Sequence, residues 1–276
     1  MYEIPPASLP GIESGGFTRL IVGHGGSSAV TGVHDPLVNI ILFSPSEVEL
    51  PLPRQDARAR HILTVLRRKE GEQFDVGLID GPRGKATLVA VGPEALRLAF
   101  AWMAPPPPLA PLRLILGLPR PQTARDLLRE GTALGVGAMD FVRTARGESS
   151  YGQSSLWTTS ESRELLVTGA AQAFCTRLPA LRHGFSLDGA IEAIPAGYSR
   201  LALDNYAAAL ALAELALPET PGVALALGAE RGWTDAERAL LRQKDFQFVH
   251  LGPRVLRMET AAIAAVSLVK AKRNWA

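Results

Sequence analysis

The chain has 276 residues, of which 47% are hydrophobic and 20% are charged. This balance is typical of a folded globular protein long enough for two domains, and it excludes a chain that is disordered throughout. A net charge of +2 and a pI near 8.8 are only mildly basic, so the total charge does not by itself indicate nucleic-acid binding.

The amino-terminal part of the sequence predicts an extension followed by a small β-barrel. Residues 1–37 are rich in Gly, Ser and Pro and lack periodicity, so we expect a flexible N-terminal extension there. Short β-like runs separated by turn signals then recur across residues 38–104 and favour a small β-barrel with one helix. The predicted strands are 39–43, 73–79, 84–91 and 96–102.

The densest basic cluster of the chain lies in the predicted helix of this region. Between positions 54 and 69 the basic residues outnumber a single acid, Asp56, which is a candidate N-cap. A short helix with a basic face can bind phosphates; the alternative is a solvated helix whose last cations complement the helix dipole. The basic residues are Arg54, Arg58, Arg60, Arg67, Arg68 and Lys69.

A proline-rich linker at residues 105–110 precedes a region in which strands and helices alternate. This alternation over residues 111–276 predicts an α/β domain with a mainly parallel sheet. The predicted strands are 112–118, 138–143, 200–204, 223–227 and 247–251. The predicted helices are 123–134, 161–174, 207–215, 235–243 and 260–272.

Two junctions of strand, loop and helix near the C-terminus are the most informative part of the sequence. Residues 251–262, LGPRVLRMETAA, combine a Gly-Pro turn, two arginines, a carboxylate and a helix start with Thr260 as the expected N-cap. Residues 224–232, ALALGAERG, are an apolar run that breaks into a Gly-rich loop before a TDAE capping box. Free backbone N–H groups at such helix starts suit a polar ligand.

These junctions resemble the C-terminal signature of the ribosomal RNA uridine-N3 methyltransferases of the SPOUT superfamily. The family's GPEGG-like loop has its counterpart in residues 228–232, and its LGPRILR-x-ETA segment in residues 251–261. The resemblance extends back through residues 116–141 and, more weakly, through residues 60–76. It implies an α/β fold in which a trefoil-knotted SPOUT-type methyltransferase domain follows a PUA-like RNA-binding β-barrel.

The resemblance also implies an activity, namely methylation of uridine N3 in 16S (small-subunit) ribosomal RNA by a homodimer that uses S-adenosyl-L-methionine and no metal. Methyl transfer from a sulfonium is a direct displacement, so the protein mainly aligns donor and acceptor. Because uracil N3 is mostly protonated at neutral pH, we expect Arg257 to stabilise the uracilate and Glu259 to accept the proton. A structural ion pair between Arg257 and Glu259 is the alternative.

The resemblance assigns cofactor and RNA contacts to the loops and to the basic residues. Small residues recur in the loops, as backbone hydrogen bonding to a cofactor would require. The residues expected to bind S-adenosyl-L-methionine are Leu203, Leu227, Gly228, Ala229, Glu230, Gly232, Leu251, Gly252, Leu256, Met258, Thr260 and Ala261. The residues expected to bind RNA are Arg58, Arg60, Arg67, Arg68, Arg120 and Arg254.

The sequence departs from the family pattern at two places. The GPEGG loop reads GAERG, which brings in Arg231, and Thr132 stands where the family has an acidic residue. Both departures favour an alternative function, a non-catalytic RNA-binding or ribosome-assembly protein on the same fold. The retained Arg257, Glu259 and Thr260 favour the enzyme.

Other features bear on the compartment and on competing functions. The single cysteine, Cys175, allows no intrachain disulfide and suits a reducing compartment. The most apolar stretch, residues 201–217, is interrupted by charged residues, so we expect a cytoplasmic protein without a membrane span. The histidines lack zinc-type spacing, and a nucleotide-dependent small-molecule enzyme lacks any phosphate-binding motif here.

Overall fold

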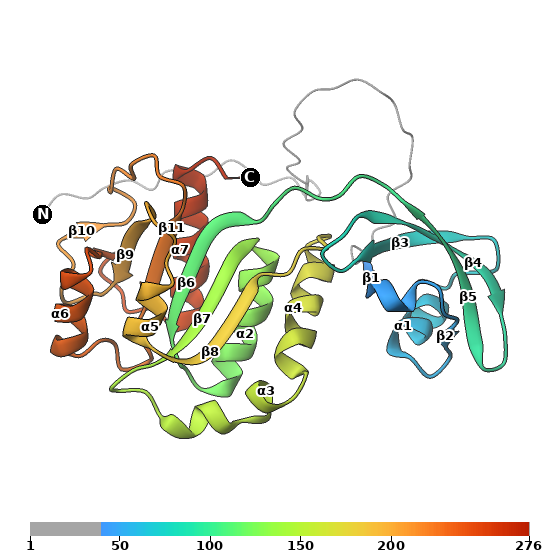
Figure 1. Ribbon diagram of the computed structural model, residues 1–276, viewed down its shortest axis with the longest axis horizontal. Helices are drawn as coiled ribbons and strands as arrows, with labels where there is room; N and C mark the ends of the chain where they lie inside the picture. Colours follow the sequence, from blue (N-terminus) through green and yellow to red (C-terminus); the bar gives the residue numbers. More distant parts are fainter. Residues whose placement is uncertain (1–39, 276) are drawn as a thin grey trace, which may run out of the picture. The chain divides into compact units, whose positions relative to one another are not determined.

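The computed structural model describes residues 40–275, which form two β-sheets with their helices (Figure 1). The extension expected at residues 1–37 lies outside the described residues. The strands of the first sheet fall within residues 41–102 and those of the second within residues 110–250, with the proline run between them.

The first sheet contains β1 (Ile41–Phe43), β2 (Leu52–Pro53), β3 (Gln73–Leu78), β4 (Arg83–Val91) and β5 (Ala95–Trp102). The strands are ordered β1-β3-β4-β5-β2. Strand β1 runs parallel to β3, and the other neighbours are antiparallel. The structure confirms the four predicted strands and adds β2, which is too short to show a period in the sequence.

The basic segment forms the predicted helix. Helix α1 (Ala57–Arg60) continues directly as the π-helix η2 (His61–Val65). The carboxylate of Asp56 accepts a hydrogen bond from the backbone N–H of Arg58 over 2.8 Å, so Asp56 is the N-cap, as predicted. Arg67 has a φ of +52°, a left-handed conformation that cannot continue a helix. The later basic residues therefore lie beyond the helix and do not complement its dipole from the last turn.

Arg58 connects this helix to the start of the sheet. Its guanidinium contacts the carboxylates of Glu47 (2.5 Å) and Asp56 (2.8 Å) and lies 4.8 Å from the ring centroid of Phe43. Hydrogen bonding to Arg58 lowers the pKa of Glu47 from 4.5 to about 2, and it also lowers the pKa of Asp56. Because two carboxylates engage the guanidinium, these contacts favour a structural role for Arg58 over the phosphate contact expected of it.

The second sheet is parallel throughout. It contains β6 (Ala110–Gly117), β7 (Val136–Arg143), β8 (Ala180–Ser186), β9 (Ser199–Leu203), β10 (Leu210–Ala211), β11 (Val223–Leu227) and β12 (Gln247–His250). Their order is β10-β12-β9-β11-β6-β7-β8. The structure confirms the five strands predicted here and adds β8 and β10.

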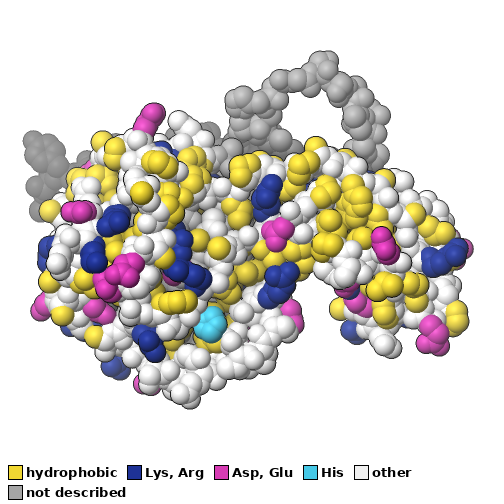
Figure 2. Space-filling model, viewed as in Figure 1, with side chains coloured by type: hydrophobic (Ala, Val, Ile, Leu, Met, Phe, Trp, Pro, Cys, Tyr) yellow, Lys and Arg dark blue, Asp and Glu magenta, His cyan; other side chains and the backbone are white. Residues whose placement is uncertain are grey.

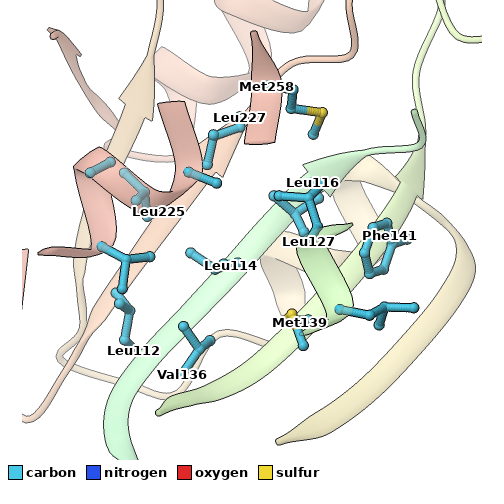
Figure 3. Packing of buried hydrophobic residues seen from close by; sticks show 14 of the residues in the cluster. Leu112, Leu114, Leu116, Leu127, Val136, Met139, Phe141, Leu225, Leu227 and Met258 are labelled. Carbon is cyan, nitrogen blue, oxygen red and sulfur yellow. The ribbon is translucent and has the colours of Figure 1, made fainter. Parts of the chain in front are cut away.

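Helices cover both faces of the second sheet. On β6, Leu114 and Leu116 pack in the core beneath α2 and α7, whereas Ile115 packs on the other face with residues of α5 and α6. Figure 3 shows the first core, in which Leu127 of α2 and Met258 of α7 lie near the strand leucines. Burial on both faces explains the nearly continuous apolar strand sequences. The helices are α2 (Pro121–Ala133), α3 (Ser155–Thr158), α4 (Glu161–Gln172), α5 (Leu187–Glu192), α6 (Asp235–Gln243) and α7 (Met258–Lys272).

Within residues 40–275, no helix combines the length and the apolar character that crossing a membrane requires.

The helix predicted at residues 207–215 is wrong, because this segment forms turns and the short strand β10. The Asp204 carboxylate accepts hydrogen bonds from the backbone N–H groups of Tyr206 (2.7 Å) and Ala207 (2.9 Å), which fixes a turn directly after β9. Strand β10 then pairs with β12. A side-chain-stabilised turn and a tertiary pairing therefore override the helical spacing of Ala and Leu.

Helix α7 begins earlier than predicted. Its first residue is Met258 and its N-cap is Arg257, which has an extended backbone and makes no side-chain capping hydrogen bond. Thr260, the expected N-cap, lies instead in the first turn and is exposed. The helix therefore begins where the extended loop ends. The presence of a threonine, a common capping residue, does not set its start.

Asp140 connects three neighbouring strands. It lies on β7 with its side chain 1% exposed, and its oxygens contact Arg113 of β6 (2.5 Å) and Arg182 of β8 (2.7 Å). A buried carboxylate requires such partners because desolvating an unpaired charge is costly. The three residues therefore form one ion-pair network across the sheet.

Replacing Asp140 with alanine would leave two guanidinium groups without their shared carboxylate. We expect Asp140→Ala to lower the free energy of unfolding by about 2–4 kcal/mol, measured by urea denaturation. The matched control is Asp126→Ala, which removes the more exposed pair with Arg129 and should cost less than about 1 kcal/mol. Equal losses in the two variants would contradict the network.

The lowered pKa of Glu47 predicts a contribution to stability that acid removes. The folded pKa of about 2 lies below the usual 4.5, so the contribution is complete above pH 4.5 and is lost as the pH falls toward 2. Glu47→Gln should therefore lower the urea midpoint at pH 7 and change it far less at pH 2. Glu49→Gln, at an exposed position nearby, is the control. An equal effect of Glu47→Gln at both pH values would refute the contact with Arg58 as the cause.

Candidate functional site

Strands β12, β9 and β11 are neighbours in the sheet and run parallel. Their carboxyl ends therefore lie at one edge, and the loops that follow them meet there. These loops line a first cavity of about 320 Å³, a volume within the range of small-molecule sites. The expected cofactor residues that line it are Leu203, Leu227, Gly228, Ala229, Glu230, Gly232, Leu251, Leu256, Met258 and Ala261.

The loop after β11 is a tight turn. The N–H of Gly232 donates to the carbonyl of Ala229 over 2.7 Å, and Gly232 has a φ of +66°, which favours glycine. Arg231 is not among the described residues with positive φ, so its backbone conformation does not require a glycine. The change from GPEGG to GAERG therefore keeps a glycine where the turn needs one.

The same loop is fixed against the end of β6. A Cβ added to Gly117 would lie 2.4 Å from the backbone nitrogen of Ala229, so only glycine allows this close approach. The carboxylate of Glu230 accepts a hydrogen bond from the backbone N–H of Arg120 over 3.0 Å. The residues at the end of β6 thus set the position of the loop.

The loop between β12 and α7 forms the opposite side of the first cavity. The N–H of Gly252 donates to Nδ1 of His250 over 3.0 Å, so His250 orders the turn. Gly252 itself does not line either cavity, and neither does Thr260. Val255 is 81% exposed on this loop, whereas Met258 at the start of α7 is buried.

A second cavity, of about 580 Å³, adjoins the first. Residues of the loop after β11 and of the segment before α7 line both cavities, and we call these shared residues the common wall. The shared residues are Glu230, Arg231, Val255, Leu256 and Met258. A group transferred directly between ligands in the two cavities would move where the cavities meet, beside this common wall.

Arg257 and Glu259 both line the second cavity. Neither side chain forms a hydrogen bond or an ion pair with any residue between 40 and 275, so the structural pair considered for them does not form there. Arg257 is the N-cap of α7 and Glu259 lies in its first turn. Both groups are therefore available to a ligand at a helix N-terminus, where the helix dipole favours negative charge.

The second cavity carries charges of both signs. One guanidinium nitrogen of Arg146 donates to the backbone carbonyl of Arg231 over 3.0 Å, which orders the rim. Basic and acidic side chains are likewise interspersed on the face shown in Figure 2. The cavity suits a polar ligand with both donor and acceptor groups. Its charged residues are Arg120, Arg146, Arg231, Arg257, Glu148, Glu230 and Glu259.

The arginines expected to bind RNA lie in separate places. Arg254 lines the first cavity and Arg120 the second. The others lie in the basic segment around α1. Arg60 and Arg67 are exposed, whereas Arg58 and Arg68 are partly buried.

Tyr206, Trp233 and Arg238 are among the residues of the first cavity that were not predicted from the sequence. The indole N–H of Trp233 donates to the carbonyl of Leu203 over 3.2 Å and links the loops after β9 and β11. Arg238 reaches the cavity from α6 by pairing with Asp204 over 2.7 Å, across 34 positions of sequence. The position of Trp233 directly after the Gly-rich loop was a usable signal, whereas no spacing links Asp204 to Arg238.

Thr132 lies away from both cavities. It is buried in α2, and its hydroxyl donates to the carbonyl of Leu128 over 2.7 Å. A Cβ added to Gly169 of α4 would lie 3.0 Å from the Cβ of Thr132. This departure from the family pattern therefore affects the packing of α2 on α4 and does not change the cavities.

Comparison with known proteins relates the chain to RNA methyltransferases. The family model described as RNA methyltransferase domain matches residues 105–270. The chain is 32% identical over 249 residues to Ribosomal RNA small subunit methyltransferase E of Treponema pallidum, with 86% of this chain and 92% of that protein covered.

Solved structures share the fold. A putative methyltransferase of Legionella pneumophila in complex with the bound cofactor SAM matches with a TM-score of 0.69 and 24% identity, covering 85% of this chain and 98% of that one. Ribosomal RNA small subunit methyltransferase E of Neisseria gonorrhoeae, bound to S-adenosyl methionine, matches with a TM-score of 0.66 and 22% identity, covering 84% and 97%.

Proposed function

Because the chain belongs to the ribosomal RNA small subunit methyltransferase E family, we propose that it transfers a methyl group from S-adenosyl-L-methionine to small-subunit ribosomal RNA. The observation that carries the proposal is the pair of adjoining cavities with a common wall. Such an arrangement can hold a small donor on one side and a polar acceptor on the other.

The first cavity fits the donor. Leu203, Leu227 and Leu251 offer apolar contacts at the ends of three strands, and the loops present backbone groups beside them. When bound, S-adenosyl-L-methionine supplies a methyl group activated by a sulfonium. The protein's own task is to orient the two reactants and exclude water, because a direct displacement depends chiefly on alignment.

The second cavity fits the acceptor, and uridine N3 is the finer part of the proposal. Arg257 would stabilise negative charge on the uracil oxygens, aided by the N-terminus of α7. Glu259, in the first turn of the helix, would accept the N3 proton directly or through water. The freedom of both side chains from other described partners supports these roles.

The remaining parts of the proposal concern fold and assembly. We propose that residues 38–104 form a PUA-like barrel that binds RNA through Arg60 and Arg67, and that residues 111–276 form a trefoil-knotted SPOUT domain joined by the linker at 105–110. The exposure of both arginines and the parallel order β12-β9-β11 support this reading. The active form would be a homodimer, which light scattering in solution can test.

The direct test is methyl transfer by the purified protein. Small-subunit ribosomal RNA, and separately the assembled subunit, should acquire label from methyl-labelled S-adenosyl-L-methionine, and nucleoside mass spectrometry should identify 3-methyluridine. Large-subunit RNA is the control. Label in a different nucleoside would reject uridine N3 alone, whereas no label with either substrate would favour the non-catalytic RNA-binding alternative.

Arg257→Ala should abolish turnover without affecting the donor, because Arg257 lines only the second cavity. We expect kcat to fall by about 100-fold or more, as when a charge-stabilising donor is removed. The affinity for S-adenosyl-L-methionine, measured by calorimetry, should stay within about twofold. Turnover like that of the wild type would remove Arg257 from the mechanism.

Arg231→Gly tests whether the altered loop impairs the donor site. Arg231 lines both cavities but is exposed, and its backbone φ is not positive, so its side chain extends toward solvent and does not strain the loop. We therefore expect the affinity for S-adenosyl-L-methionine to change by less than about twofold. Donor binding that appears only in Arg231→Gly would instead favour the alternative in which this chain has lost its cofactor.

A further inference from the structure

A buried carboxylate organises one side of the first cavity. The side chain of Asp204, at the end of β9, is 3% exposed. One oxygen accepts hydrogen bonds from the backbone N–H groups of Tyr206 (2.7 Å) and Ala207 (2.9 Å). The other accepts a hydrogen bond from Nε of Arg238 (2.7 Å). Asp204 therefore fixes both the turn that carries Tyr206 and the side chain of Arg238.

Arg238 is held on two sides and lies against an aromatic ring. Its Nη1 contacts Asp235 over 2.9 Å, while Nε contacts Asp204, and its side chain is 12% exposed. The carbon at the centre of its guanidinium lies 5.9 Å from the ring centroid of Tyr206. This cation–π contact engages one face of the ring and leaves the other face free.

Tyr206 is unusually exposed for an aromatic residue whose backbone is held by a hydrogen bond and whose ring contacts a guanidinium. It is 87% exposed, lines the first cavity and makes no hydrogen bond through its hydroxyl within residues 40–275. Trp233 in the same cavity is instead fully buried. A large ring held at a cavity mouth with one open face is suited to stacking on a flat ligand.

We propose that Tyr206 is a specificity-determining residue that stacks on the adenine ring of the donor, with Asp204 and Arg238 as its positioning residues. This inference rests on the proposed function, because it takes S-adenosyl-L-methionine as the ligand of the first cavity. It adds to that function a contact between a side chain of the protein and the adenine ring of the donor.

The position of Tyr206 decides which part of the donor it meets. The reactive methyl group must lie at the wall shared by the two cavities, which is formed by the loop after β11 and the residues before α7. Tyr206 lines the first cavity but not the second, and it follows β9 in the chain. The ring therefore faces a part of the ligand away from the methyl group. Of the two parts on either side of the sulfonium, only adenine offers a flat ring on which Tyr206 can stack.

Calorimetry with Tyr206→Phe and Tyr206→Leu separates stacking from simple apolar contact, since both replacements are large and only Phe keeps the ring. We expect Tyr206→Phe to bind S-adenosyl-L-methionine within about twofold of the wild type and Tyr206→Leu to bind about fivefold or more weakly. Equal binding by Tyr206→Leu and the wild type would overturn the proposal.

S-adenosylhomocysteine, which lacks the positive charge, separates a contact with adenine from a contact with the sulfonium. Stacking on adenine predicts the same fold-loss in Tyr206→Leu for both ligands. A loss confined to S-adenosyl-L-methionine would show a contact with the sulfonium instead and would overturn the assignment to the base. If the wild type binds neither ligand, the proposed function fails, and this outcome is distinct from a failure of the stacking proposal.

Asp204→Asn tests the positioning role. The variant keeps the size of the side chain but removes the charge that holds Arg238, so we expect weaker ligand binding and no further loss when Tyr206→Leu is added. Additive losses would show that Asp204 acts independently of the ring. Because Tyr206 is exposed, the Tyr206 variants test the stacking even if Asp204→Asn does not fold.

Discussion

The site depends on one constraint, the parallel pairing of β9 with both β11 and β12. Parallel neighbours place their carboxyl ends at one edge, so loops that are distant in sequence meet there without any loop having to reach far. The burial of both faces of the sheet keeps that edge rigid, because the strands cannot shift without disrupting two cores. The loops can therefore differ from the family pattern, as the loop at 228–232 does, while the strands stay in place.

The common wall of the two cavities is held in place from two sides. Gly117 lets the end of β6 approach Ala229 closely, and Glu230 holds the same loop through the N–H of Arg120. Met258 anchors the other half of the wall in the core beneath α7, as Figure 3 shows. A ligand in each cavity would meet the other beside this common wall, and fixing the wall fixes how two such ligands are aligned, which a displacement reaction requires.

The sequence predicted the parts of the fold whose local pattern and tertiary role agree. The apolar runs of β6 and β11 and the capping box of α6 are examples, and the loops at 228–232 and 251–257 indicated the candidate site. Strand β8 escaped prediction because it is an edge strand with mostly exposed residues and a glycine at φ +80°. The false helix at 207–215 traces to the turn fixed by Asp204 and to the pairing of β10 with β12. The setting of Tyr206 also depends on Arg238 of α6, which no local pattern links to Asp204.

A crystal structure of the protein with S-adenosyl-L-methionine tests the central claim most directly. We expect the ligand in the first cavity, between the loops that follow β9, β11 and β12, with its methyl group toward the second cavity. Well-ordered ligand bound elsewhere, with the first cavity empty, would contradict the account of how this fold makes its site.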